Sequence, residues 1–98
     1  MAKTIVWSPL AQSKRKEILA FWIKNNKSNR YSATLNKLFK EAARLLSIYP
    51  EIGKRTYIKN VRVKIVRDYQ IYYQIEDDRI LLLTIWDSRQ NPEELKLK

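Results

Sequence analysis

Six cationic side chains and no carboxylate lie within fifteen consecutive residues, GKRTYIKNVRVKIVR, from Gly53 to Arg67. Lysine and arginine at this density bind phosphate groups, and neighbouring tyrosine rings can stack on unpaired bases. The alternative is an ordinary solvated sheet face, which needs no ligand. We predict that this segment binds nucleic acid, and the predicted contacts are Lys54, Arg55, Tyr57, Lys59, Arg67 and Tyr69.

Alternation within this segment places two of the cations on one side of a strand. Arg62 and Lys64 alternate with Val61, Val63 and Ile65. Successive side chains of a strand point to opposite faces of the sheet. We expect helices to cover the valine side, so that Arg62 and Lys64 face outward on a basic concave surface.

A third arginine follows a strand near the end of the sequence, in TIWDSRQNP at residues 84–92. We expect Arg89 to converge with Arg62 and Lys64 on one phosphate; the alternative is an ion pair between Arg89 and Asp87. The three cations are a candidate catalytic set for RNA cleavage by the substrate's own 2′-hydroxyl. Lys64 would take the proton, and the two arginines would stabilise the developing negative charge by about 3–4 kcal/mol per well-placed donor.

Composition limits the chemistry that is open to this chain. Its 98 residues include 20 Lys and Arg against 10 Asp and Glu, a net charge of +10 that favours polyanionic partners. The absence of cysteine and histidine excludes disulfides, thiol nucleophiles, the usual zinc sites and imidazole catalysis. We expect no metal and no cofactor, since the acidic turn Glu76–Asp78 is weak ground for a metal site. No stretch resembles a signal peptide or reaches membrane-spanning length, so we expect a cytoplasmic protein without membrane contact.

Helical signals dominate the first half of the chain. Ser8 and Pro9 are typical of a helix start and predict a helix that runs to about Lys24. A stripe of apolar residues at helical spacing predicts a second helix, which begins near Ser32 and ends before Pro50. The short polar link between the two favours an antiparallel helical hairpin.

Strand signals occur before the helices and again after Gly53. They predict strands at residues 3–7, 61–65, 71–76 and 80–86. The last of these is almost entirely apolar, so it should be central and covered on both faces, with the N-terminal strand at an edge. We predict one α+β domain over residues 1–98, of order β-α-α-β-β-β, with the helical hairpin packed on one face of a mainly antiparallel sheet. The tail at residues 92–98 either adds a helical turn or hangs free.

The segment VRVKIVRDYQIYYQIEDDRILLLTIWDSRQNPEEL, together with this element order and the small basic chain, resembles the RelE/ParE superfamily of toxins from bacterial type II toxin–antitoxin modules. The resemblance covers the whole chain and is strongest over residues 61–92. It implies a toxin that stops growth and is neutralised by a co-expressed acidic antitoxin, in a hetero-oligomeric complex.

The superfamily contains two mechanisms, and the residues match both in part. RelE-like members cleave messenger RNA in the ribosomal decoding site, whereas ParE-like members inhibit DNA gyrase. Arg62 and Lys64 match the basic positions of the nuclease strand, and Arg89 matches the final arginine within one position. Gln70 stands where the nucleases usually have an arginine, and residues 90–95 lack the tyrosine that often follows. The ending WDSRQNP is similar to that of ParE-like members. A metal-independent messenger ribonuclease, a gyrase inhibitor without nuclease activity and a general nucleic-acid-binding module therefore all remain open.

Overall fold

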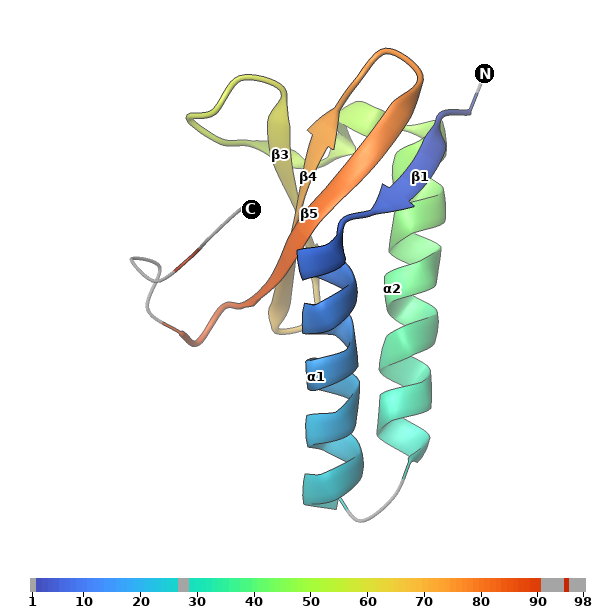
Figure 1. The fold of residues 1–98 in the computed structure, drawn as a ribbon, viewed down its shortest axis with the longest axis vertical. Helices are drawn as coiled ribbons and strands as arrows, with labels where there is room; N and C mark the ends of the chain where they lie inside the picture. Colours follow the sequence, from blue (N-terminus) through green and yellow to red (C-terminus); the bar gives the residue numbers. More distant parts are fainter. Residues whose placement is uncertain (1, 27–28, 91–94, 96–98) are drawn as a thin grey trace.

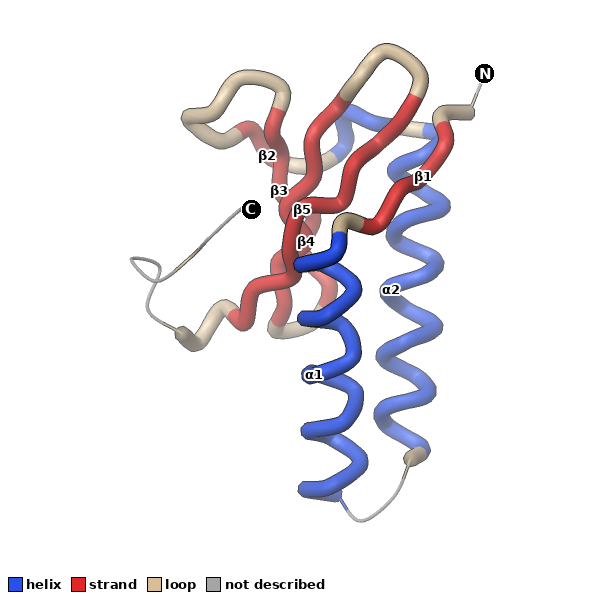
Figure 2. Tube along the Cα trace, in the orientation of Figure 1, coloured by secondary structure: helices blue, strands red, loops and turns tan. Residues whose placement is uncertain are grey.

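A two-layer arrangement of a helical hairpin and a sheet makes up the molecule (Figures 1 and 2). The computed structural model describes residues 2–26, 29–90 and 95. The elements in chain order are β1 (Thr4–Trp7), α1 (Pro9–Asn26), α2 (Arg30–Ile48), the 3-10 helix η1 (Pro50–Ile52), β2 (Lys54–Arg55), β3 (Val61–Val66), β4 (Tyr69–Ile75) and β5 (Arg79–Asp87). This confirms the predicted α+β architecture, to which the structure adds the short strand β2. The predicted outcomes for the tail at 92–98 lie outside the described residues, apart from residue 95.

The sheet has the strand order β1-β5-β4-β3-β2. β5 therefore lies inside it, parallel to β1 on one side and antiparallel to β4 on the other, while β1 is an edge strand. Consecutive residues of β5 from Leu82 to Trp86 are all buried, so both faces of this strand are covered. Its apolar sequence indicated this position correctly, because only a strand without a solvent face can carry such a run.

The start of α1 and the end of α2 each have hydrogen-bonding partners for their free backbone groups. The Ser8 hydroxyl accepts a hydrogen bond from the Ala11 N–H at 3.0 Å and donates one to the Leu83 carbonyl at 2.9 Å, which caps α1 and ties its start to β5. At the end of α2, the N–H of Tyr49 donates to the Leu45 carbonyl at 2.8 Å. Pro50 then begins η1, since proline cannot continue the preceding helix.

The core lies between α2 and the helix-facing side of the sheet. Phe39 is fully buried at its centre and packs edge-on against Tyr69, with ring centroids 5.9 Å apart. From α1, the indole N–H of Trp22 donates to the Tyr69 hydroxyl at 2.8 Å. The other buried members of the cluster are Ala11, Leu35, Ala42, Ala43, Leu46, Val66, Ile71, Tyr73, Ile80, Leu82 and Ile85.

Candidate functional site

The cationic residues of β3 lie on the helix-facing side of the sheet, so the prediction that they face outward is wrong. Arg62 is directly opposite Tyr73 and Lys64 directly opposite Ile71 in the β3–β4 pairing. Residues opposite one another in a ladder share a face, and both of these partners are fully buried in the core. On the other face Ile65 is 53% exposed. Because β3 lies near the margin of the helical layer, its helix-facing positions border solvent, where long cationic side chains can reach water.

Arg62 holds the backbone of the segment that follows α2. Its Nη1 donates to the carbonyl oxygen of Glu51 at 3.0 Å and to that of Gly53 at 2.8 Å. The side chain thereby fastens η1 and the start of β2 to β3. Part of its hydrogen-bonding capacity is already committed to this structural role.

Tyr73 holds the same segment from the core side. Its hydroxyl donates to the Pro50 carbonyl at 2.7 Å and accepts from the Gly53 N–H at 3.0 Å. A Cβ at Gly53 would lie 2.8 Å from both the Tyr73 ring and the Val63 carbonyl oxygen, so only glycine fits at this close approach. Arg62 and Tyr73 together define the position of η1 relative to the sheet.

Replacing Tyr73 by phenylalanine is expected to lower the free energy of unfolding by about 1–3 kcal/mol at neutral pH, because buried backbone groups of Pro50 and Gly53 lose their partner. Burial also raises the pKa of the Tyr73 phenol, so the folded chain holds this proton more tightly than the unfolded chain. The resulting stabilisation is complete below about pH 10 and is lost as pH rises through the higher folded-state pKa. Urea denaturation of both proteins, at neutral pH and in steps above about pH 9, measures both effects.

The matched control is Tyr57→Phe. The Tyr57 side chain is 98% exposed, so the loss of its hydroxyl should leave the free energy of unfolding unchanged. Burial also raises the pKa of Tyr69 and Tyr72, so the alkaline loss of stability should become shallower in Tyr73→Phe without vanishing. Equal stability of Tyr73→Phe and the parent chain at neutral pH would contradict the assignment.

Arg89 forms the ion pair that was the alternative expectation. Its Nε and Nη2 donate to the two carboxylate oxygens of Asp87 at 2.9 and 2.8 Å, and its backbone N–H donates to the same carboxylate at 2.9 Å. The hydrogen bond from the Arg89 side chain lowers the pKa of Asp87. A bidentate pair of this kind fixes the guanidinium plane beside the end of β5.

The predicted catalytic triad is not assembled. Asp87 is in register with Tyr69 and through it with Val66, whereas Arg62 lies near the other end of β3. Four residues of strand separate the two ends, roughly 13 Å at the rise of a β-strand. Lys64 lies between them in a shallow groove of about 320 Å³, against the α2 side chains Leu38 and Leu45. In this structure the three cations do not converge, because Arg62 is held by the Glu51 and Gly53 carbonyls and Arg89 by the Asp87 carboxylate. The sequence could not show this, because which cations meet depends on the register between strands.

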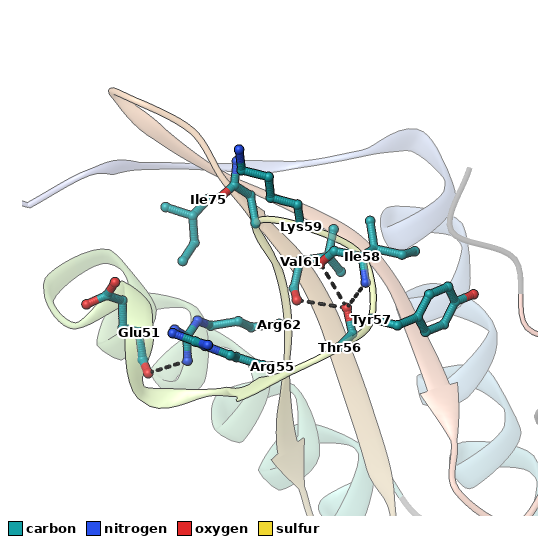
Figure 3. Close-up of a pocket in the computed structure, with 10 residues that line it drawn as sticks. Glu51, Arg55, Thr56, Tyr57, Ile58, Lys59, Val61, Arg62 and Ile75 are labelled. Carbon is teal, nitrogen blue, oxygen red and sulfur yellow. Dashed lines mark hydrogen bonds between the residues drawn. The ribbon is translucent and has the colours of Figure 1, made fainter.

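The predicted nucleic-acid contacts divide into three groups. Arg55, Tyr57 and Lys59 line a concavity of about 430 Å³ between η1 and the β2–β3 loop (Figure 3). Lys54 and Arg67 are exposed elsewhere, Lys54 opposite Val63 in the β2–β3 ladder and Arg67 beside the α2–β3 groove. The prediction that Tyr69 contacts nucleic acid is wrong, because its side chain is only 3% exposed and its hydroxyl accepts a hydrogen bond from Trp22.

The concavity also contains residues that the sequence did not single out. Glu51 enters it from η1 and Asn60 from the loop, where Asn60 has a positive φ of 65°. Arg62, predicted as catalytic, borders the same space. No local sequence signal marks Glu51, since its approach to the loop depends on how η1 folds back on β3.

Two negative findings apply to the part of the chain that the structure describes. No three histidine, cysteine, aspartate or glutamate side chains gather there as metal ligands, and Glu76 is paired with Arg79. Neither of the described helices is long and apolar enough to pass through a membrane.

Comparison with known proteins identifies the class to which this fold belongs. A solved chain described as "Chromosomal ParDE TA system from P. aeruginosa" superposes with a TM-score of 0.73 at 12% identity, covering 86% of this chain and 94% of that one. At this identity the likeness shows the fold. The family described as the ParE toxin of the type II toxin–antitoxin system, parDE, matches residues 5–92, so the chain belongs to that family. The search of curated proteins finds no match.

Proposed function

We propose that this chain arrests bacterial growth by inhibiting DNA gyrase, in the cytoplasm, and that it does not cleave messenger RNA. As a ParE toxin of a type II system it is a growth-inhibiting protein paired with an antitoxin. Gyrase inhibition is the mechanism that resemblance to ParE-like members implies. The observation that carries the proposal against the nuclease mechanism is the separation of Arg62 from Arg89 along the sheet.

The chemistry of RNA cleavage explains why this separation supports the proposal. A nuclease without histidine needs a base for the 2′-hydroxyl and cations on the same phosphate, each within hydrogen-bonding distance. Here Arg62 is bound to two carbonyl groups and Arg89 to the Asp87 carboxylate. Lys64 shares a face of β3 with Arg62, but Ile71 is directly opposite it and Arg89 is at the end of another strand. The arrangement supports a toxin that acts by binding another macromolecule.

The partner that restrains the toxin is the cognate antitoxin of the module. We infer that its toxin-binding segment is acidic and partly apolar, because the chain carries a net charge of +10 and the groove between α2 and β3 combines Lys64 and Arg67 with Leu38 and Leu45. Complementary charge accelerates association and suppresses wrong partners.

One protein preparation tested in two assays separates the mechanisms. Primer extension on messenger from translating ribosomes should show intact messenger, and a supercoiling assay with purified gyrase should show loss of supercoiling or accumulation of DNA breaks. The matched variant is Lys64→Ala. In a nuclease this change would slow the cleavage of messenger severely. Under our proposal, messenger stays intact with both the parent chain and the variant. Messenger cut within the decoding site, together with normal supercoiling, would overturn gyrase inhibition and revive the ribonuclease.

A further inference from the structure

Two arginines from neighbouring strands meet in the concavity beside η1. Arg55 of β2 and Arg62 of β3 are directly opposite in the antiparallel ladder, so their side chains share a face. Figure 3 shows them extended side by side toward η1, with Lys59 from the β2–β3 loop bordering the same space. Three cationic side chains therefore surround one concavity of about 430 Å³.

These cations have no anionic partner among the described residues. The ion pairs found there join Arg79 to Glu76 and Arg89 to Asp87, and neither involves the concavity. Glu51 borders the concavity, but it meets Arg62 through its backbone carbonyl and not through its carboxylate. Two guanidinium groups side by side without a carboxylate create a local positive potential that attracts an external anion.

The loop beside the cations presents an aromatic ring to solvent. Tyr57 is 98% exposed, the most exposed of the large apolar side chains in the described chain. Its ring projects from the loop on the side away from the guanidinium groups (Figure 3). The loop itself is held in shape, since the Thr56 hydroxyl donates to the Val61 carbonyl at 2.9 Å and accepts from the Ile58 N–H at 3.1 Å. The backbone that carries the ring is thus held in place beside the cations.

We propose that this concavity and loop form a binding site for single-stranded nucleic acid, with Arg55 and Lys59 on the phosphates and a base stacked on Tyr57. Cations that follow a backbone beside an exposed aromatic ring are the usual composition of such sites. The tyrosine favours a nucleic acid over an acidic peptide, because carboxylates explain the cations but leave the ring without a partner. A single strand is favoured over a duplex, because its bases are free to stack. The site does not depend on gyrase inhibition, and either proposal can fail without the other.

Direct binding to short labelled strands tests the proposal. Fluorescence anisotropy of the full chain with oligothymidylate DNA and oligouridylate RNA of about ten nucleotides, over a range of salt, should show saturable binding to at least one. The better ligand identifies the strand chemistry. No binding to either at low salt would overturn the site.

Paired variants distinguish this site from a general effect of positive charge. Arg55→Gln with Lys59→Gln should weaken binding and reduce the slope of log affinity against log salt by about 1.4, since each phosphate contact on a single strand contributes about 0.7. Lys37→Gln with Lys40→Gln removes the same charge from exposed positions on α2 and should leave the slope unchanged. Equal losses in the two double variants would overturn the proposal.

The aromatic contact has its own test. Tyr57→Ala should weaken binding at least about fivefold, whereas Tyr57→Phe keeps the ring and should bind like the parent chain. Glu51→Gln should strengthen binding, because it removes the one carboxylate that borders the concavity. Full affinity in Tyr57→Ala, or displacement of the strand by polyglutamate at equal concentration of charges, would show an anion site without base contacts and overturn the assignment.

Discussion

We expect growth to stop when this chain is induced in a bacterial host without its antitoxin, and to resume when the cognate antitoxin is expressed from a second promoter. The reason is its membership of the family of ParE toxins of type II toxin–antitoxin systems. Colony counts after induction from a tight promoter, with the soluble toxin measured in the same cultures, check the prediction. We expect a fall of several orders of magnitude in the culture without antitoxin.

A folded chain is required for this effect, which supplies an internal control. A core-destabilised variant expressed from the same promoter should be less toxic, in proportion to the soluble folded protein that remains. Normal growth at a high level of soluble parent chain would contradict the toxin assignment for this protein.

The core variant with the largest expected effect is Phe39→Ala, which should lower the free energy of unfolding by about 3–5 kcal/mol. Phe39 is fully buried between α2 and the sheet, and its ring packs on Tyr69. Removing the ring leaves a cavity that the surrounding strands can fill only in part. A domain of this size has about 5–15 kcal/mol of stability in total, so a large share of it would be lost. Urea denaturation followed by tryptophan fluorescence measures the change.

Phe21→Ala is the matched control, because it makes the same chemical change on the neighbouring helix α1. The Phe21 side chain is 51% exposed and contacts the Trp22 ring at its edge. Its loss should cost about 1 kcal/mol or less. If the two variants were equally stable, Phe39 would not occupy the centre of the core as described.

Secondary structure and the burial of individual elements could be predicted because both depend on local pattern. The spacing of Leu35, Phe39, Ala42 and Leu46 requires a helix with one buried face, and these residues are buried in the structure. The uninterrupted apolar run of β5 likewise required an inner strand. The short strand β2 was missed, since two paired residues leave no periodicity to detect.

The arrangement of the site could not be predicted in the same way. Alternation along β3 divides its side chains between two faces, but the sequence does not say which face meets the helices. The valines suggested that their own side faces the helices. The pairing of Arg62 with the buried Tyr73 shows that the side of Arg62 does. The ion pair of Arg89 with Asp87 could be predicted as an alternative, because the two residues are only two positions apart in the sequence.

The sequence by itself determined a small basic α+β domain, its helical hairpin, its inner strand and the concentration of cations between Gly53 and Arg67, because each follows from composition or from periodicity within one segment. Only the tertiary structure decided which cations meet. Register between strands separates Arg62 from Arg89 and places Arg55 beside Arg62, and register depends on the geometry of the turns and on the packing of the core. Contacts between residues distant in sequence are formed by the whole fold at once, so no single segment encodes them.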